Sequence, residues 1–446
     1  MALSGLDIYK LLPKTNCKEC GFATCLAFAM QLAKKAVSID KCPYLSEEAR
    51  RTLEASAQPP IKLVSIGTSE NKLQIGNEMV MFRHEEKFYN PCGVGFIIED
   101  RLSSREIKDR VEKISRLKFE RVGQQLNINL IAVKQAGAKD KFIDALKLVS
   151  ANTGIALVLM TKDIQALKEA IALVKSTRPL VYHIDPSSLL EAAKLAQENG
   201  LPFVASSDNL EKLSVLTKEL SSAGLNELVL GISGKKGISE KIWELTQIRR
   251  LALKKSDRSL GYPVITVVES NDPYEEVIEA ATYISKYSGI VLLKGIESWQ
   301  ALSILTLRQN IYTDPQKPLQ IEPKVYSVGQ TTEGSPVLVT TNFSLSYYTV
   351  LGEVEASKIP SYIISVDTEG MSVLTAWAAE KFTPGSISQT LNKFGVDKIV
   401  SHKKLVIPGY VAVMSGDLEE QSGWQIIVGP KEAAGIPSFL KNLQAA

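Results

Sequence analysis

The fold of the central chain is decided by Ile128-Asn-Leu-Ile-Ala-Val133, a helix-like stretch over residues 139–150, and Ile155-Ala-Leu-Val-Leu-Met160. Both runs are apolar except for Asn129 and contain several β-branched residues, which is typical of parallel strands buried on both faces. Parallel strands need a crossover connection, and the stretch between the two runs has the apolar spacing of an amphipathic helix. The sequence therefore predicts a strand–helix–strand unit here.

The same pattern recurs along the central chain, where most apolar runs are followed by an amphipathic helix. The eight runs are Val94–Ile98, Ile128–Val133, Ile155–Met160, Leu180–Ile184, Pro202–Ala205, Leu228–Ile232, Val264–Val268 and Ile290–Leu293. Eight such units are typical of a (β/α)8 barrel. We therefore predict a TIM barrel over residues 93–310.

The predicted barrel strands end in polar residues, among them Asp208 and Asn271, but every barrel of this kind has polar strand ends. No carboxylate pair, Cys/His pair or phosphate loop stands out among them. His183 lies inside a strand run and is interpreted as a core histidine rather than a catalyst. No catalytic residue is predicted in the barrel.

Four of the five cysteines lie upstream of the barrel, in the pattern C-x2-C-x4-C-x16-C formed by Cys17, Cys20, Cys25 and Cys42. Thiolates gathered this closely indicate a metal centre. A [4Fe–4S] cluster is favoured over Zn because only one CxxC pair is present, Gly21 follows the second cysteine and Pro43 follows the last. Disulfides are a more distant alternative. Residues 1–57 form the predicted module, closed by a helix over Ser46–Ala57.

Residues 58–92 join this module to the barrel and contain two short β-like runs, Ile61–Ile66 and Glu78–Arg83. We interpret this segment as a linker with a small hairpin, which would let the metal module move relative to the rest. Cys92, at its end, is interpreted as a packed thiol rather than a ligand.

Residues 311–335 are rich in Pro and Gly and predict a second linker, and residues 336–446 predict a small doubly wound, Rossmann-like α/β domain. Such domains bind ligands outside the carboxyl ends of their strands. The predicted strands are Val337–Thr340, Ser361–Val366, Lys398–Val400, Lys404–Ile407 and Trp424–Val428. Turn-forming residues follow several of them, so the backbone can approach a large planar or anionic ligand closely, whereas ordinary βα turns look the same.

Composition excludes several function classes. The chain has 52 Lys and Arg against 49 Asp and Glu, a net charge of +3 that argues against a nucleic-acid or membrane-surface role. No apolar run approaches the length of a membrane span, and the first residues lack the features of a signal peptide. We expect a cytoplasmic protein of two or three domains.

A cysteine module, a barrel and an α/β domain follow one another in this order. The last contains Val366-Asp-Thr-Glu-Gly-Met371-Ser-Val-Leu374 and Leu405-Val-Ile-Pro-Gly409. The whole chain thus resembles the large (gamma) subunits of corrinoid/iron–sulfur proteins of the acetyl-CoA (Wood–Ljungdahl) pathway. The cysteine module is the most specific part of the resemblance.

The resemblance implies that Cys17, Cys20, Cys25 and Cys42 ligate a [4Fe–4S] cluster and that the C-terminal domain holds a cobamide. The implied cobamide contacts are Thr340, Ser346, Gly370, Met371, Ser372, Val373 and Ala433. The implied function is to accept a methyl group from methyltetrahydrofolate on Co(I), through a separate methyltransferase, and to pass it to acetyl-CoA synthase. The cluster would serve the reductive reactivation of Co(II), and implied partners include a small subunit and a reductive activator protein.

The chain departs from the common corrinoid motif D-x-H-x-x-G, which would supply a histidine to the lower face of cobalt. His402 is the one histidine in the last domain, and its setting Ser401-His402-Lys403-Lys404 is that of a solvated basic turn. The resemblance implies that the cobamide is held base-off, without a protein histidine ligand. Two alternatives remain: a pterin-dependent methyltransferase whose own barrel catalyses the transfer, with residues such as Asp208 and Asn271 positioning the ring, or an iron–sulfur scaffold subunit.

Overall fold

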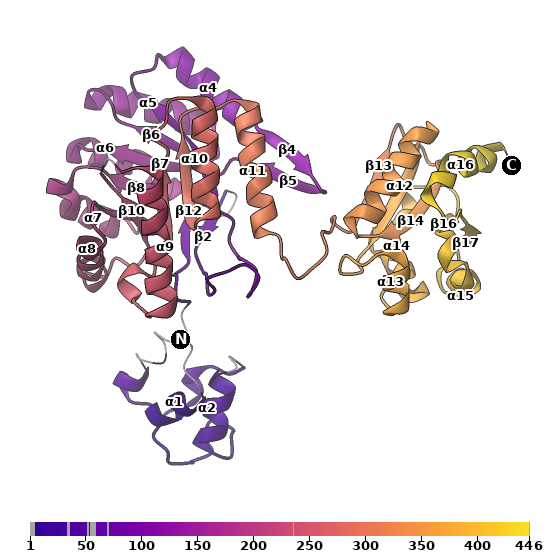
Figure 1. The fold of residues 1–446 in the computed structure, drawn as a ribbon, viewed down its shortest axis with the longest axis horizontal. Helices are drawn as coiled ribbons and strands as arrows, with labels where there is room; N and C mark the ends of the chain where they lie inside the picture. Colours follow the sequence, from indigo (N-terminus) through magenta and orange to yellow (C-terminus); the bar gives the residue numbers. More distant parts are fainter. Residues whose placement is uncertain are drawn as a thin grey trace. The chain divides into compact units, whose positions relative to one another are not determined.

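The computed structural model describes residues 5–33, 36–50, 53, 59–68, 71–234 and 236–445. These residues divide into two compact units. The first contains residues up to 118 and residues 127–312, and the second contains residues 119–126 and 313 onwards. Figure 1 shows the helices and strands of both units.

The N-terminal module is built on two short helices, α1 (Gly5–Leu11) and α2 (Cys25–Ala33), and a 3-10 turn, η1 (Ile39–Lys41). Its core gathers Ile8, Leu12, Phe28, Ala29 and Leu53 together with Cys25 and Cys42. The predicted helix over Ser46–Ala57 is helical at residues 47–50 and at Leu53, and its remaining residues lie outside the described part of the chain.

The predicted TIM barrel is confirmed: eight parallel strands close into a barrel in the order β3-β6-β7-β8-β9-β10-β11-β12. The strands are β3 (Gly93–Glu99), β6 (Leu130–Lys134), β7 (Ala156–Thr161), β8 (Leu180–His183), β9 (Phe203–Ser207), β10 (Leu228–Ile232), β11 (Val264–Val267) and β12 (Ser288–Leu293). Each of the eight predicted runs contributes one strand, because burial on both faces makes each run largely apolar.

Helices follow the strands and lie around the outside of the barrel (Figure 1). They are α4 (Ser104–Arg116), α5 (Lys139–Asn152), α6 (Ile164–Val174), α7 (Leu189–Glu198), α8 (Leu210–Ser222), α9 (Ile238–Lys254), α10 (Pro273–Ser285) and α11 (Ser298–Tyr312), with 3-10 turns η2 (Lys175–Thr177), η3 (Pro186–Ser188) and η4 (Arg258–Leu260). Several of these helices begin directly after a residue whose side chain caps the helix. At α4, for example, Ser103 and Glu106 form a capping box.

A hairpin from the predicted linker belongs to the barrel core. Strands β1 (Val64–Ile66) and β2 (Leu73–Ile75) pair antiparallel. Their apolar side chains join the cluster that fills the barrel, alongside Leu130, Val158 and Ile290. The second strand lies at Leu73–Ile75 and not in the predicted run Glu78–Arg83, of which Glu78 forms an isolated bridge with Ile61 that continues the register of the hairpin. The part of the predicted linker that the structure describes is therefore packed from Ile61 onwards and does not form a free tether.

A second hairpin, not predicted, interrupts the first part of the barrel. Strands β4 (Lys118–Arg121) and β5 (Gln124–Asn127) form a two-stranded sheet, joined by Val122 and Gly123, which both have positive φ. This is the geometry of a type I′ turn. Val122 packs against the hydrophobic core of the second unit, with which residues 119–126 cluster.

The C-terminal domain has a five-stranded sheet in the order β13-β15-β14-β16-β17, parallel except for β13. The strands are β13 (Val325–Val328), β14 (Val337–Thr341), β15 (Ser361–Val366), β16 (Lys404–Ile407) and β17 (Gln425–Val428). Strand β13 lies in the predicted 311–335 linker, and the predicted strand Lys398–Val400 is wrong, because this stretch begins in a 3-10 turn.

Helices cover both faces of this sheet, as predicted for a doubly wound domain. Residues of α12 and α16 pack on one face, and residues of α13, α14 and α15 pack on the other. The helices and turns are α12 (Ser344–Ser357), α13 (Val373–Ala378), α14 (Pro384–Lys393), η5 (Val396–Lys398), η6 (Gly409–Met414), α15 (Ser415–Ser422), η7 (Ala433–Gly435) and α16 (Ile436–Ala445).

Within the described ranges, no helix combines the length and the apolar character needed to cross a membrane.

Candidate functional site: a thiol module and a cavity at the switch point of the C-terminal sheet

The loop that carries the first cysteines is held in an unusual backbone conformation. Lys14, Asn16, Lys18 and Gly21 all have positive φ, and three of these four residues are not glycine. Such residues cost free energy and persist where the surroundings impose them, which is common around bound groups. The Asn16 side chain accepts a hydrogen bond from the Cys25 backbone N–H at 2.8 Å and ties this loop to the start of α2.

All five cysteines are free thiols. Cys25 and Cys42 are buried, Cys20 is half-buried and Cys17 is exposed. Burial raises the pKa of the Cys42 thiol, and the neighbouring thiolates of Cys20, Cys17 and Cys25 raise this pKa further. Cys17, Cys20 and Cys25 thus lie within electrostatic reach of Cys42.

Within the described residues, no three Cys, His, Asp or Glu side chains are already drawn together as a metal-binding set. The chemistry of the donors nevertheless fits a thiolate-ligated centre, since four free thiols are available: Cys17 and Cys20 on the strained loop, Cys25 at the start of α2 and Cys42 directly after η1. Two of these thiols, Cys25 and Cys42, are part of the apolar core of the module, where bound metal would be shielded from water.

A second candidate site is a cavity of about 310 Å³ in the C-terminal domain. It opens at the carboxyl ends of β14 and β16, lined there by Thr340, Ile407 and Pro408. The chain leaves β14 towards β15 on one side and later enters β16 on the other, so these two strands form the topological switch point of the sheet. Ligands of doubly wound domains bind at this point.

Five of the seven predicted cobamide contacts line this cavity: Thr340, Ser346, Ser372, Val373 and Ala433. Gly370 and Met371 lie in the preceding loop and do not line it; Gly370 is buried and Met371 packs partly into the core under the sheet. The structure therefore brings together residues from β14, α12, α13 and η7 that are up to 93 positions apart, as from Thr340 to Ala433.

Sequence reasoning missed the apolar rim of this cavity. Leu345 and Tyr410 line it while remaining 67% and 44% exposed. Leu374 and Trp377 of α13 are also exposed, next to the lining residue Val373. Exposed apolar side chains gathered at a concave edge indicate a ligand or a protein partner. The sequence shows apolar residues near the starts of α12 and α13, Leu345 and Leu374, but their exposure is visible only in the structure.

Neither ring nitrogen of His402 is available to a ligand in this cavity. Its Nε2 donates to the Ser335 carbonyl at 3.0 Å, and its Nδ1 accepts from the Lys404 N–H at 3.1 Å. His402 also precedes β16, whereas the switch-point cavity lies at the opposite end of that strand. The other two histidines of the chain, His84 and His183, belong to the first unit.

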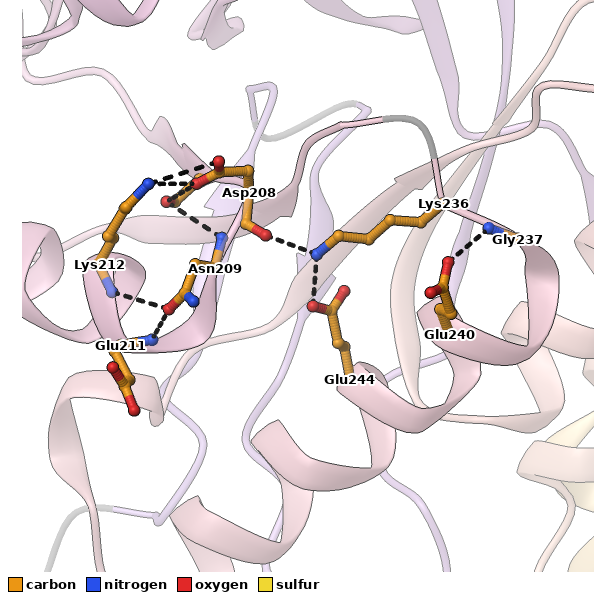
Figure 2. A network of polar contacts seen from close by, with 9 residues as sticks. Asp208, Asn209, Glu211, Lys212, Lys236, Gly237, Glu240 and Glu244 are labelled. Carbon is orange, nitrogen blue, oxygen red and sulfur yellow. Dashed lines mark hydrogen bonds and ion pairs between the residues drawn. The ribbon is translucent and has the colours of Figure 1, made fainter.

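Several polar side chains at the strand ends of the barrel are engaged in hydrogen bonds and ion pairs with neighbouring groups. Figure 2 shows Lys236, after β10, reaching across to the Asp208 carbonyl at 2.6 Å and to Glu244 of α9. The Asp208 carboxylate pairs with Lys212 at 3.2 Å. Asn271, the other residue considered for a pterin, accepts from Lys294 at 2.9 Å. These contacts link the loops at the mouth of the barrel to one another.

Two further residues have the structural roles that the sequence favours. His183 is fully buried, and its Nε2 lies 2.7 Å from the Ser188 hydroxyl. Cys92 is fully buried, and burial raises the pKa of its thiol to about 12, so it remains an unreactive thiol at neutral pH.

Two family models match the chain, one over the barrel and the C-terminal domain and one over the thiol module. A family model described as the CO dehydrogenase/acetyl-CoA synthase delta subunit matches residues 63–440, and an Fe-S cluster family model matches residues 12–44. A crystal structure of 7,8-dihydropteroate synthase from Vibrio fischeri covers 56% of this chain and 99% of its own, with 12% identity and a TM-score of 0.42; this likeness says nothing about a ligand.

Relatives match from end to end. The corrinoid/iron-sulfur protein large subunit of Moorella thermoacetica is 45% identical over 442 residues, covering 99% of both chains. The acetyl-CoA decarbonylase/synthase complex subunit gamma of Methanothermobacter thermautotrophicus is 36% identical over 458 residues, again covering 99% of both. Because these matches include the thiol module, the barrel and the C-terminal domain together, this chain belongs to the family of corrinoid/iron–sulfur protein large (gamma) subunits.

Proposed function

We propose that the protein is a cytoplasmic methyl carrier of the acetyl-CoA pathway that holds a cobamide at the switch-point cavity of its C-terminal domain. The observation that carries the proposal is the cavity itself, an apolar-rimmed space of about 310 Å³ where a doubly wound sheet binds ligands. A space of this size takes only part of a cobamide, so most of the corrin ring would rest on the exposed rim. The names of the relatives point to the same cofactor.

Residues of the cavity would bind and orient the cobamide rather than react. Thr340, Ser346 and Ser372 offer hydroxyl groups among otherwise apolar walls, which suits a large ligand with amide side chains. When bound, the cobamide supplies the cobalt that takes up and releases the methyl group. The engaged nitrogens of His402 support the absence of a histidine ligand from the C-terminal domain, because neither nitrogen would be free to bind the cobamide.

Cys17, Cys20, Cys25 and Cys42 would hold the [4Fe–4S] cluster, which supplies low-potential electrons for reactivation. We infer that the methyl group comes from methyltetrahydrofolate through a methyltransferase and goes to acetyl-CoA synthase. A small subunit would cover the apolar rim around Leu345 and Tyr410. A reductive activator protein would act on the inactive Co(II) form.

The test measures iron, sulfide, zinc and cobalt, with an optical spectrum, in protein co-produced with its small subunit and purified without oxygen in the presence of cobamide. About four irons and one cobalt per heterodimer are expected. Zinc in place of iron would overturn the cluster assignment. Iron without cobalt would overturn the carrier proposal and favour a scaffold subunit, and tight binding of a pterin by this chain alone would favour a barrel enzyme.

A further inference from the structure

Asn342 lies directly after β14 and is 1% exposed, yet it does not line the switch-point cavity. We propose that Asn342 is the positioning residue of the cobamide site: its side-chain amide holds the loop Asp367–Met371 in the one conformation that presents Ser372 and Val373 to the ligand. The inference rests on the proposed function and identifies how this chain shapes that site before the cofactor arrives.

The amide oxygen of Asn342 is a shared hydrogen-bond acceptor for several groups of the loop. It accepts hydrogen bonds from the backbone N–H groups of Thr368 and Gly370, each at 3.0 Å. The Thr368 hydroxyl also lies 3.0 Å from this oxygen and 3.1 Å from the Met371 carbonyl. The amide nitrogen donates to Gln320 and to the Asp367 carboxylate, both at 3.1 Å. These partners determine the orientation of the amide, because exchanging its oxygen and nitrogen would place the NH2 group against the N–H groups of Thr368 and Gly370.

The loop needs such an anchor because its own backbone is strained. Glu369 and Gly370 both have positive φ, at 55° and 75°. For Glu369 this left-handed conformation costs free energy, and it persists only where surrounding contacts impose it. Gly370 is also confined by its neighbours, since a Cβ added there would lie 2.6 Å from the Gln320 Cγ. Without Asn342, the strained turn has lost its principal partner.

The consequence for binding follows from the position of the loop. Met371 is followed at once by Ser372 and Val373, which line the cavity and begin α13. If the loop takes up this conformation only part of the time, the apparent affinity falls in proportion to the populated fraction. Asn342 therefore sets cobamide affinity through the loop, without touching the ligand.

Two measurements on the full-length chain, co-produced with its small subunit, test this role. The first is hydrogen exchange of the cofactor-free protein, comparing the unsubstituted chain with Asn342→Ala. The amides of Thr368 and Gly370 should exchange at least tenfold faster in the variant, while those of β14 and β15 stay protected. The second is titration with hydroxocobalamin followed by the visible spectrum, where Asn342→Ala should bind at least tenfold more weakly.

Two companion variants keep the test sharp. Thr368→Val removes one hydroxyl from the same network with little change of shape, and should shift both readouts in the same direction by a smaller factor. It decides the question if Asn342→Ala does not fold. Asn392→Ala, at an exposed position of α14, should leave loop exchange and affinity unchanged.

The outcomes separate the two levels of the proposal. Selective loosening of the loop with weaker binding supports the role of Asn342. Unchanged loop exchange, or a loosened loop with unchanged affinity, overturns that role while leaving the cobamide site in place. If the unsubstituted chain itself fails to bind hydroxocobalamin, the proposed function is overturned, and the positioning role with it.

Discussion

At the scale of single residues, the edge of the switch-point cavity depends on close approach between two backbone loops. A Cβ added to Gly409 would lie 2.6 Å from the Gly429 carbonyl oxygen and 2.8 Å from the Lys431 nitrogen. Real Cβ atoms do not come this close to backbone, so any side chain at Gly409 would push the loops after β16 and β17 apart. Gly429 and Lys431 line the cavity. Its shape therefore depends partly on the absence of a Cβ at Gly409.

We predict that Gly409→Ala destabilises the C-terminal domain by roughly 1–3 kcal/mol, because the two loops must separate to admit the methyl group. The same separation should weaken hydroxocobalamin binding several-fold. Thermal unfolding and a spectroscopic titration measure the two effects.

The matched control is Gly416→Ala, at an exposed position of α15 where an added Cβ meets nothing within 4 Å. Alanine in place of glycine should there stabilise the helix by up to about 1 kcal/mol. Equal behaviour of the two variants would contradict the role given to the loop contact.

At the scale of elements, the segment before the barrel is clamped to α9 by a buried ion pair. The Arg249 guanidinium lies 3.2 Å from the Glu78 carboxylate, and both side chains are at most 7% exposed. Arg249 also donates to the Val80 carbonyl and stacks near the rings of Phe88 and Tyr287. Burial raises the pKa of Glu78 despite its partner, which shows how strongly the site is desolvated.

We predict that Arg249→Met costs about 3–5 kcal/mol of stability in the first unit, because it leaves the Glu78 carboxylate buried without its partner. The double variant Arg249→Met with Glu78→Leu should recover much of this loss, since no charge then remains buried. Denaturant unfolding of the two variants measures both values.

Arg250→Met serves as the control because Arg250 is exposed on the same helix, and its effect should stay within about 0.5 kcal/mol. A double variant as unstable as Arg249→Met alone would show that the clamp works through packing rather than charge.

At the scale of the whole molecule, the thiol module and the C-terminal domain have separate hydrophobic cores. The module core is built from residues such as Ile8 and Phe28, whereas the two faces of the C-terminal sheet are packed by residues such as Phe382 and Leu440. Among the residues that the structure describes, none belongs to more than one of these clusters. The two cofactor sites should therefore load independently of each other.

We predict that the double variant Cys17→Ser with Cys20→Ser loses its iron but still binds one cobamide per chain. Unfolding of the barrel and of the C-terminal domain should occur at unchanged temperatures, because neither core contains these cysteines. Metal analysis and calorimetry measure these quantities. The companion variant Cys92→Ser should keep its iron, and loss of cobalt together with iron would contradict independent loading.

Local pattern was enough to predict most elements of this protein. The eight barrel strands were predictable because burial on both faces leaves a continuous apolar run, as in Ile155–Met160. The grouping of the four cysteines was readable as spacing alone. Strand β13 was missed because an edge strand is half-exposed and lies among prolines, and the β4–β5 hairpin was missed because its strands are short and polar.

By itself, the sequence determined the order of the three parts, the barrel and the residues that can ligate metal. Only the tertiary structure decided that the hairpin over Val64–Ile75 packs into the barrel core, and that Thr340, Ser372 and Ala433 meet at one cavity. The physical reason is range. Periodicity and spacing act between neighbours along the chain, whereas a switch point and the Asn342 network exist only once distant strands have paired.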